Sequence, residues 1–514
     1  MNEAEHDRLV KALCDPALYP HGARHVHHVR THISSLLLTG PYVYKLKRPV
    51  DFGFLNFTRL DDRRHYCEEE LRLNRRLAPG MYVDVVPIYG MVDAPRLTGE
   101  GPVLEYAVRM VQLPAWRADW ATRPGAEARL RRLARRLAHF HAGVPRSDAS
   151  SPYGTPEIVA RHALDNFRAL APELPAADAA HVAHLEAWSR AGFRAKRAAF
   201  EQRRVAGYVR ECHGDLHLGN VALVHGMPRV FDCIEFDPEL RWIDVLSELA
   251  FLLMDLLVQG QRARAVTVLD TYLAATGDYA GLALLDDYLV YRALVRAKVA
   301  VLSHDVPGAH PYLAFAERVA APGTGAFVLT CGVSGSGKSY VSDQLLAPLG
   351  AVRLRSDVER KRLYPEAAPG QLHAGRYSAA ATEHTYTHLA EQAAALARAG
   401  MVALVDATFL ERARRETFYG LARALGVPCA VLHFDAPAET LRARVQARAA
   451  RGGDASEADL RVLEAQLAGA QPPEDDEPVI RVSSAGPLDV DVLLGALADY
   501  HVAPQRYLAT PAGG

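Results

Sequence analysis

The most constraining feature of this sequence is the segment 332–339, which reads Gly-Val-Ser-Gly-Ser-Gly-Lys-Ser. It directly follows the apolar run 327–330 and precedes sequence with helical character. Glycines allow successive backbone N–H groups to face one anion, and the N-terminus of the following helix adds its positive end. The pattern therefore predicts a strand, a phosphate-binding turn and a helix, as in a parallel α/β sheet.

Each residue type in this turn has an expected task. Lys338 is expected to reach the β- and γ-phosphates of ATP as a catalytic cation, and Ser339 is expected to bind Mg²⁺. Lys338 is informative because only seven of the 59 basic residues are lysines. The predicted nucleotide-binding residues are Gly332, Ser334, Gly335, Ser336, Gly337, Lys338, Ser339 and Tyr340.

Two acidic residues follow the next apolar runs of this region. Asp357 comes shortly after the run 351–354, and Asp406 directly follows the run 402–405. Ligands bind at the carboxyl ends of parallel strands, so both carboxylates are expected beside the phosphate-binding turn. Asp406 is predicted to order Mg²⁺ through water. A helix N-cap at Ser356 or Asp357 is the alternative structural role.

This arrangement resembles the P-loop kinases of the polynucleotide-kinase, gluconate-kinase and zeta-toxin type. The resemblance implies that Asp357 activates the acceptor hydroxyl as the catalytic base, and that Arg360 holds the acceptor or its phosphate. It also implies a lid whose arginines close over the phosphates, for which Arg444, Arg448 and Arg451 are candidates at helical spacing. A solvated basic helix face explains the same arginines equally well, so both interpretations stay open.

The first 320 residues have a different pattern. Alternating apolar residues over 33–39 and 42–47 flank Gly-Pro and predict a hairpin, and a helix is expected over 60–77. Strands are expected over 83–89 and 103–113. From about residue 126 to 320 the pattern is helical, apart from a short strand-rich segment over 212–236. A small mixed lobe followed by a mostly helical lobe is the layout of kinase-like folds.

A set of oxygen-bearing side chains lies in that strand-rich segment. Asp215 and Asn220 stand five residues apart in His-Gly-Asp-Leu-His-Leu-Gly-Asn, and Asp232 lies in an apolar run beyond them. Phosphoryl transfer needs a carboxylate for the acceptor hydroxyl and oxygen ligands for Mg²⁺. The segment resembles the aminoglycoside phosphotransferase family. This resemblance implies that Asp215 is the catalytic base and that Asn220 and Asp232 are Mg²⁺ ligands.

Asp232 is followed by Cys-Ile-Glu instead of the Phe-Gly of protein kinases. This departure favours a small-molecule or other non-protein acceptor. Glu235 and Asp237 lie close enough in sequence to contribute to the metal or acceptor site.

The N-lobe is expected to supply a cation for the phosphates and a carboxylate that holds it. Lys45 and Lys47 share one face of the expected strand 42–47, because residues i and i+2 point the same way. Lys45 is preferred, since Lys47 lies nearer the strand end. Glu70 is the preferred carboxylate, and Glu69 is its rival.

Composition excludes several classes of protein. The formal net charge is −1, so no global field attracts nucleic acid or membrane. The six cysteines have no metal-ligand spacing and are expected to be buried thiols in a reducing compartment. The N-terminus lacks a secretory pattern, and the most apolar stretch, 249–258, is too short to span a bilayer. A cytoplasmic protein is expected.

The predicted architecture is an α+β kinase-like bilobal domain followed by an α/β P-loop domain with a parallel sheet. The expected boundaries are 1–320, with the lobes meeting near residue 113, and 326–514. The predicted activity is ATP-dependent transfer of the γ-phosphoryl group to hydroxyls of small molecules at two sites. Two alternatives are a regulatory switch in which one module controls the other, and a kinase of nucleic-acid ends, which the neutral net charge disfavours. The acceptors, the preference for ATP over GTP and the oligomeric state stay open.

Overall fold

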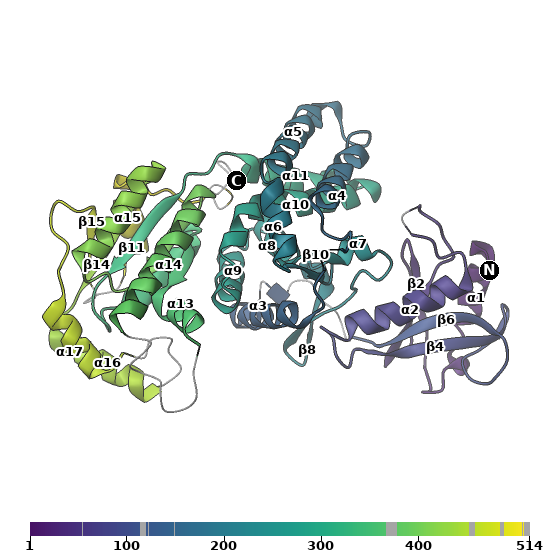
Figure 1. Ribbon diagram of the computed structural model, residues 1–514. Helices are drawn as coiled ribbons and strands as arrows, with labels where there is room; N and C mark the ends of the chain where they lie inside the picture. The colour runs from purple at the N-terminus through teal and green to yellow at the C-terminus, as the bar shows by residue number, and fades with distance from the viewer. Residues whose placement is uncertain are drawn as a thin grey trace. The chain divides into compact units, whose positions relative to one another are not determined.

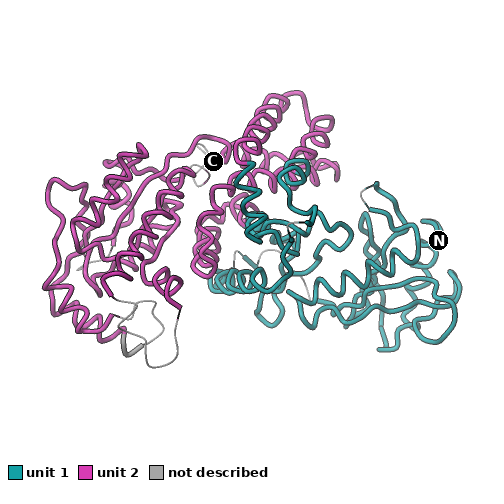
Figure 2. The backbone as a smooth tube through the Cα atoms, in the orientation of Figure 1, with its two compact units in different colours: residues 1–162, 197–252 teal, residues 163–196, 253–514 magenta. Residues whose placement is uncertain are grey.

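The computed structural model describes the chain except residues 54, 114–119, 122, 149, 366–377, 452–457, 484–487, 506 and 508–514; the side chains of 449–451 are also left undescribed. The chain divides into two compact units (Figure 2). Unit 1 comprises residues 1–162 and 197–252, and unit 2 comprises residues 163–196 and 253–514. This division by packing differs from the expected boundary near residue 320, which stays a prediction.

Unit 1 contains a six-stranded sheet in which every neighbouring pair is antiparallel (Figure 1). In spatial order its strands are β1 (His27–Arg30), β2 (Ser34–Leu38), β3 (Tyr42–Lys47), β6 (Val103–Val111), β4 (Tyr82–Met91) and β5 (Ala94–Arg96). The expected hairpin is formed by β2 and β3, which pair across Gly40-Pro41.

The two faces of this sheet pack against different helices. Leu46 of β3 lies in one apolar cluster with Leu9 of α1 (Glu3–Ala12). Val108 of β6 lies in another cluster with Cys67 of α2 (Leu60–Asn74). Because side chains alternate along a strand, Lys45 points away from the Leu46 face, toward α2.

The rest of unit 1 is helical with two small antiparallel ribbons. The helices are α3 (Ala126–Gly143), the first part of α4 (Pro156–Leu170), α6 (Arg197–Val205), α7 (Pro238–Arg241) and the first part of α8 (Val245–Val258). The ribbons pair β7 (Val209–Glu211) with β10 (Trp242–Asp244) and β8 (Val221–Val224) with β9 (Met227–Val230). The loop between β7 and β8 carries Asp215.

Unit 2 contains a five-stranded parallel sheet (Figure 1). Its spatial order is β12 (Val352–Arg355), β13 (Val402–Asp406), β11 (Ala326–Cys331), β14 (Cys429–Asp435) and β15 (Val479–Ser483). Its helices are α5 (Ala179–Ala195), α9 (Arg262–Thr276), α10 (Leu285–Leu302), α11 (Val306–Ala320), α12 (Lys338–Leu349), α13 (Ser356–Leu363), α14 (Ala379–Arg398), α15 (Arg412–Leu425), α16 (Ala438–Arg451), α17 (Leu460–Gly469) and α18 (Val490–Asp499).

Helices cover both faces of the parallel sheet. Val328 of β11 packs in one apolar cluster with Leu345 of α12 and Leu497 of α18. On the opposite face, the ring of Phe327 meets that of Phe418 of α15 edge-on, with centroids 5.9 Å apart. Strand β11 is the central strand of the sheet, and all its residues are buried. The phosphate-binding turn follows its carboxyl end, where ligands bind in such sheets.

Among the described helices, none combines the length and the apolar character needed to cross a lipid bilayer.

Candidate active sites

The phosphate-binding turn of unit 2 joins β11 to α12. Gly335 and Gly337 have φ angles of 84° and 99°, a region that side chains other than glycine rarely adopt. A Cβ on Gly335 would also lie 3.1 Å from the carbonyl oxygen of Leu441. The first N–H groups of α12 lack partners four residues earlier within the helix, so they are directed toward the turn. This is an anion cradle built from main-chain donors.

Lys338 lies inside this turn and is buried. Its Nζ donates to the carbonyl oxygens of Gly332 and Val333, each at 2.8 Å. Burial lowers the pKa of the Lys338 ammonium, and the nearby carboxylates of Asp406 and Asp357 only partly oppose that effect. The buried ammonium group therefore gains from any anion placed in the cradle.

Ser339 and Asp406 meet beside the turn. The Ser339 hydroxyl donates to Asp406 Oδ2 at 2.9 Å, and Arg355 Nε lies 3.7 Å from the same oxygen. Hydroxyl and carboxylate oxygens are the hard ligands that Mg²⁺ prefers. The donor set therefore fits the predicted metal role of these two residues.

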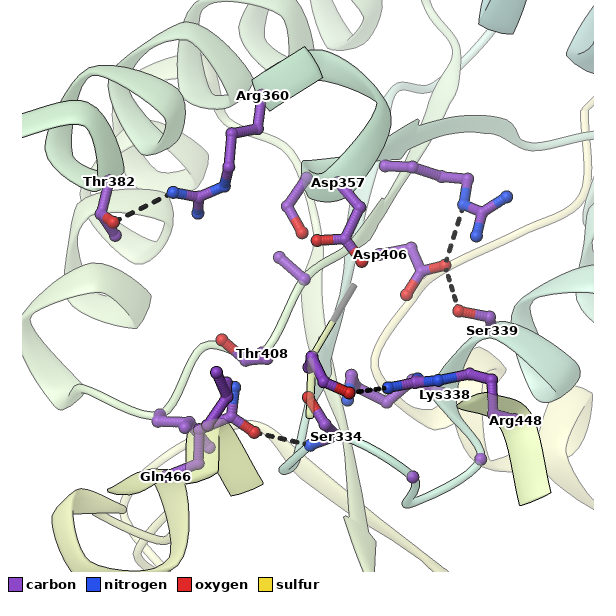
Figure 3. A pocket seen from close by; sticks show the side chains of 18 of the residues that line it. Ser334, Lys338, Ser339, Asp357, Arg360, Thr382, Asp406, Thr408, Arg448 and Gln466 are labelled. Carbon is purple, nitrogen blue, oxygen red and sulfur yellow. Dashed lines mark hydrogen bonds and ion pairs between the residues drawn. The ribbon is translucent and has the colours of Figure 1, made fainter. Parts of the chain in front are cut away.

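Asp357 shares one cavity with the turn. This cavity of about 790 Å³ is lined by Lys338, Ser339, Asp357 and Asp406, among others (Figure 3). Asp357 lies in the first turn of α13, whose N-cap is Arg355, and no side chain caps the helix. The alternative of an N-cap at Ser356 or Asp357 is therefore wrong. Asp357 instead lines the cavity from the first turn of α13.

Two further helices border the same cavity. Arg444 and Arg448 of α16 line it, and Arg444 Nη1 donates to the Gly335 carbonyl at 3.3 Å. The Arg451 side chain lies outside the described residues. Gln466 of α17 accepts a 2.8 Å hydrogen bond from Ser334 N–H. No motif pointed to Gln466, because its role depends on the return of α17 to the turn.

A second, smaller cavity of about 380 Å³ adjoins the turn. Tyr340, Phe434 and Val482 line it together with Arg444. The Tyr340 side chain is 62% exposed beside it. An apolar and aromatic lining next to a phosphate cradle suits a flat ring system such as a nucleobase.

Helix α13 is held in place at its buried side. Glu359 is fully buried and accepts from Arg362 Nε at 3.0 Å and from the Tyr279 hydroxyl at 3.3 Å. His388 Nε2 lies 3.3 Å from the same carboxylate. Arg362 also donates to the Ala274 carbonyl in the last turn of α9 at 2.8 Å. These bonds set the position of the helix that carries Asp357.

Unit 1 brings together the residues expected to hold phosphates. Lys45 Nζ lies 2.8 Å from Glu70 Oε1 and 2.7 Å from Asp232 Oδ1. Lys47 Nζ lies 2.8 Å from the other Glu70 oxygen and contacts Glu235. Burial alone would raise the pKa of Glu70, but the two ammonium groups lower it to about 2. Glu70 is therefore an anion shared by both lysines.

The two lysines differ in exposure and partners. The Lys47 side chain is fully buried, and its ammonium lies 5.1 Å from the centre of the Phe57 ring. The Lys45 side chain is 11% exposed and reaches Asp232, the predicted metal ligand. Lys45 thus contacts the predicted metal ligand, and the preference for Lys45 as the phosphate-binding cation stays a prediction. Glu69 instead pairs with Arg72 at 2.8 Å on the helix surface.

A buried carboxylate, that of Glu248, binds the backbone of the loop that carries Asp215. Glu248 Oε2 accepts 2.7 Å bonds from the N–H groups of both His213 and Gly214. Its other oxygen lies 3.2 Å from His141 Nε2. Burial would raise the pKa of Glu248, but its partners, led by His141, keep it below the ordinary value. Sequence patterns did not single out Glu248.

Asp215 and Asn220 form hydrogen bonds with each other in the same loop. Asn220 Nδ2 donates to Asp215 Oδ2 and to the Asp215 carbonyl, both at 2.9 Å. The Asn220 carbonyl accepts from Phe231 N–H at 3.0 Å, which ties the loop to the residue before Asp232. Asp232 has a φ of 64°, an uncommon conformation for an aspartate. The carboxylate, amide and carboxylate oxygens fit a divalent cation.

Two acidic residues near this site, expected to contribute to the metal or acceptor site, make other contacts. Glu235 is buried against Lys47, and burial raises its pKa although that ammonium opposes the effect. Asp237 accepts from Glu239 N–H at 2.8 Å and caps the short helix α7. Both acidic residues therefore make structural contacts, and their contribution to the metal or acceptor site stays a prediction.

Comparisons with known proteins match both parts of the chain. The model of the phosphotransferase enzyme family matches residues 40–285, and the model described as an AAA domain matches residues 327–473. A protein of Mycobacterium tuberculosis (strain ATCC 25618 / H37Rv), described as uncharacterized, is 28% identical over 475 residues. That alignment covers 90% of this chain and 93% of the relative.

Two solved structures are each similar to a portion of the chain. A choline/ethanolamine kinase family protein from Mesorhizobium loti is 16% identical with a TM-score of 0.37, covering 61% of this chain and 94% of its own. A gluconokinase from Sinorhizobium meliloti 1021 is 21% identical with a TM-score of 0.26, covering 35% and 92%. On the two family models, residues 40–285 match the phosphotransferase enzyme family and residues 327–473 match an AAA domain, and the chain is an ATP-dependent kinase.

Proposed function

We propose that the chain is a tandem phosphotransferase with two sites, each transferring the γ-phosphoryl group of ATP to a hydroxyl of a small molecule. The observation that carries this proposal is the cavity of unit 2. It gathers a main-chain phosphate cradle with Lys338, the oxygen pair of Ser339 and Asp406, and the carboxylate of Asp357. Phosphoryl transfer depends mainly on such positioning and charge stabilisation.

In unit 2, Lys338 holds the β- and γ-phosphates while Asp357 accepts the proton of the acceptor hydroxyl. The acceptor oxygen then bonds to the γ-phosphorus as the bond to the β-γ bridging oxygen breaks, which leaves ADP and a phosphate ester. Ser339 and Asp406 would hold Mg²⁺, which neutralises phosphate charge when bound. Arg444 and Arg448 cover the phosphates from α16.

In unit 1, the same tasks fall to side chains from three separate segments. Lys45, oriented by Glu70, holds the phosphates, and Asp215 receives the proton of the acceptor hydroxyl. Asn220 and Asp232 would hold Mg²⁺, because their oxygens fit that cation. The contact of Lys45 with both Glu70 and Asp232 supports this assignment.

Two single substitutions in the full chain test the proposal. The protein is incubated with γ-labelled ATP and a metabolite extract, and the labelled products are separated by mass. Lys338→Met is expected to abolish one labelled product and Asp215→Asn another. Lys11→Met, at an exposed position, is the matched control and should preserve both.

The outcome distinguishes the proposal from a regulatory switch. If either substitution removes the same single product, one module controls the other and the tandem proposal fails. If labelled products persist in the Lys338→Met, Asp215→Asn double variant, neither site carries the transfer.

A further inference from the structure

Helix α9 (Arg262–Thr276) is covered by the match to the phosphotransferase family, which extends from residue 40 to residue 285. By packing, however, α9 belongs to unit 2, together with the parallel sheet of the P-loop (Figure 2). Val266 of α9 lies in the same apolar cluster as Leu345 of α12 and Val328 of β11. The core of the P-loop sheet therefore includes a helix from outside the matched AAA domain, 327–473.

The Arg353 side chain connects α9 to two elements of the P-loop sheet. Arg353 lies on β12, and its Nε and Nη2 donate to the two carboxylate oxygens of Asp270 of α9 at 3.2 Å and 2.9 Å. Its Nη1 donates to Asp343 of α12 at 2.6 Å. The Arg353 and Asp270 side chains are only 5% and 10% exposed. A contact made of two parallel hydrogen bonds fixes the orientation of the partners as well as their distance.

A second set of contacts attaches helix α13 to the end of α9. Tyr279 follows α9, and its buried hydroxyl group donates to the buried Glu359 of α13 at 3.3 Å. Arg362 of α13 donates to the Ala274 carbonyl in the last turn of α9 at 2.8 Å. Gly277, with a φ of 72°, makes this approach possible, because a Cβ there would lie 2.6 Å from Arg362 Nε. The end of α9 therefore fits closely against α13.

The two attached elements, β12 and α13, carry residues of the P-loop cavity. Arg355 lies two residues after Arg353 on β12, and its Nε lies 3.7 Å from Asp406 Oδ2. Asp357 follows in the first turn of α13 and lines the cavity together with Lys338. A shift of β12 or α13 would therefore move Arg355 and Asp357 relative to the phosphate-binding turn. Misplacing a catalytic group by about 1 Å can lower a rate about 100-fold.

Desolvation offsets much of the attraction within a buried ion pair, so the pair of Asp270 and Arg353 fixes geometry more than it adds stability. We propose that Asp270 and Tyr279 are positioning residues of the P-loop site. They act on Arg355 and Asp357 by fixing β12 and α13. The P-loop site thus depends on a segment that belongs to the phosphotransferase family match. This inference rests on the proposed kinase function of unit 2.

The positioning role has a reciprocal consequence for α9. Arg353 also holds α12, whose N-terminus forms the anion cradle, so the docking of α9 favours nucleotide binding at the turn. Nucleotide must then stabilise docked α9 by the same free energy. A residue pair that only stabilised the fold would give α9 no dependence on nucleotide at the P-loop.

Hydrogen exchange of the full chain measures this coupling, with Mg²⁺ and a non-hydrolysable ATP analogue as the probe. The analogue is expected to slow exchange at 332–339 and also over α9, at 262–276. Lys338→Met should abolish both effects, which separates them from binding in unit 1. Asp270→Asn should retain the protection of the turn and lose most of the protection of α9.

Transfer assays test the effect of the same residues on the reaction. The Asp215→Asn chain is incubated with γ-labelled ATP and a metabolite extract, so that only the P-loop site is active. Asp270→Asn is expected to lower Lys338-dependent transfer at saturating ATP about tenfold, and Asp270→Glu to restore part of the loss. Asp491→Asn, at an exposed position of α18, is the matched control and should leave transfer unchanged.

Tyr279→Phe is the milder second variant, because it removes a single hydroxyl group and keeps the ring. It should lower the same transfer less than Asp270→Asn does, since Arg362 still holds Glu359. This variant keeps the test decisive if Asp270→Asn fails to fold.

Each outcome bears on one claim. Protection of 332–339 by the analogue without protection of 262–276 would overturn the positioning role and leave the kinase proposal intact. Unchanged transfer in both Asp270→Asn and Tyr279→Phe would overturn it in the same way. Absence of Lys338-dependent transfer from the Asp215→Asn chain would instead overturn the proposed kinase function of this site, and the positioning role with it.

Discussion

Replacing Glu248 by alanine is expected to destabilise unit 1 by about 2–6 kcal/mol, because two buried N–H groups lose their acceptor. His213 and Gly214 each donate to Glu248 Oε2 at 2.7 Å. Leaving one buried donor unsatisfied costs about 1–3 kcal/mol, and the two amides together give the stated range. His141 loses its carboxylate partner as well.

Glu248→Gln is the matched variant, since it keeps the shape and one acceptor oxygen. Hydrogen bonds to an ionised group are about twice as strong as neutral ones, so this change should cost roughly half as much as alanine. The loop that carries Asp215 would loosen in both variants. Asp215-dependent transfer should therefore fall more in Glu248→Ala than in Glu248→Gln.

Hydrogen exchange and activity measure the two consequences together. The amides of His213 and Gly214 should exchange faster in both variants, in the same order as the loss of stability. Lys338-dependent transfer by the same molecule is the internal control and should not change. Equal loss of both activities, or unchanged exchange at the two amides, would refute the idea that Glu248 supports this loop.

Two other substitutions address pH and helix positioning. His6 is buried, and burial lowers its pKa from 6.5 to about 4. As pH falls, His6 is protonated in the unfolded chain before it is protonated in the folded one. The free energy of unfolding is therefore fully present above pH 6.5 and falls by about 3 kcal/mol as pH drops to about 4. His6→Gln should flatten that part of the urea midpoint-versus-pH curve, and an unaltered slope would refute the assignment. Arg362→Ala removes the bonds of α13 to Glu359 and the Ala274 carbonyl and should lower P-loop transfer about tenfold, since small misplacements of a catalytic group are costly. The exposed Arg461→Ala is its control, and a similar loss in both would contradict a specific role for Arg362.

Short sequence patterns predicted much of the fold, because a phosphate-binding turn and a buried strand each need particular residue types within a few positions. The turn at residues 332–339 needs glycines and a lysine at fixed spacing. Four of the five parallel strands stand out as short apolar runs, at 327–330, 351–354, 402–405 and 429–434. Strand β15 (Val479–Ser483) was not predicted, because it has exposed residues and lies at the edge of the described sheet, next to β14. Its sequence lacks the continuous apolar character of a central strand.

Residues whose roles depend on packing were harder to find. Lys45 and Lys47 are equivalent on a strand pattern, and only their surroundings separate a fully buried lysine from one that reaches Asp232. Glu248 and Gln466 act on backbone N–H groups more than 30 residues away along the chain. Neither Glu248 nor Gln466 belongs to a sequence motif with fixed spacing.

The two sites use a lysine in opposite electrostatic settings. Lys45 lies between the carboxylates of Glu70 and Asp232, and although burial opposes it, these anions raise its pKa well above the ordinary value. Lys338 has carbonyl oxygens as hydrogen-bond partners, and burial lowers its pKa. At the proposed unit 1 site a phosphate would compete with two carboxylates for Lys45, whereas at the P-loop a phosphate would pair with a buried cation held by neutral groups. The P-loop site should therefore draw more of its nucleotide affinity from its single lysine than the unit 1 site does.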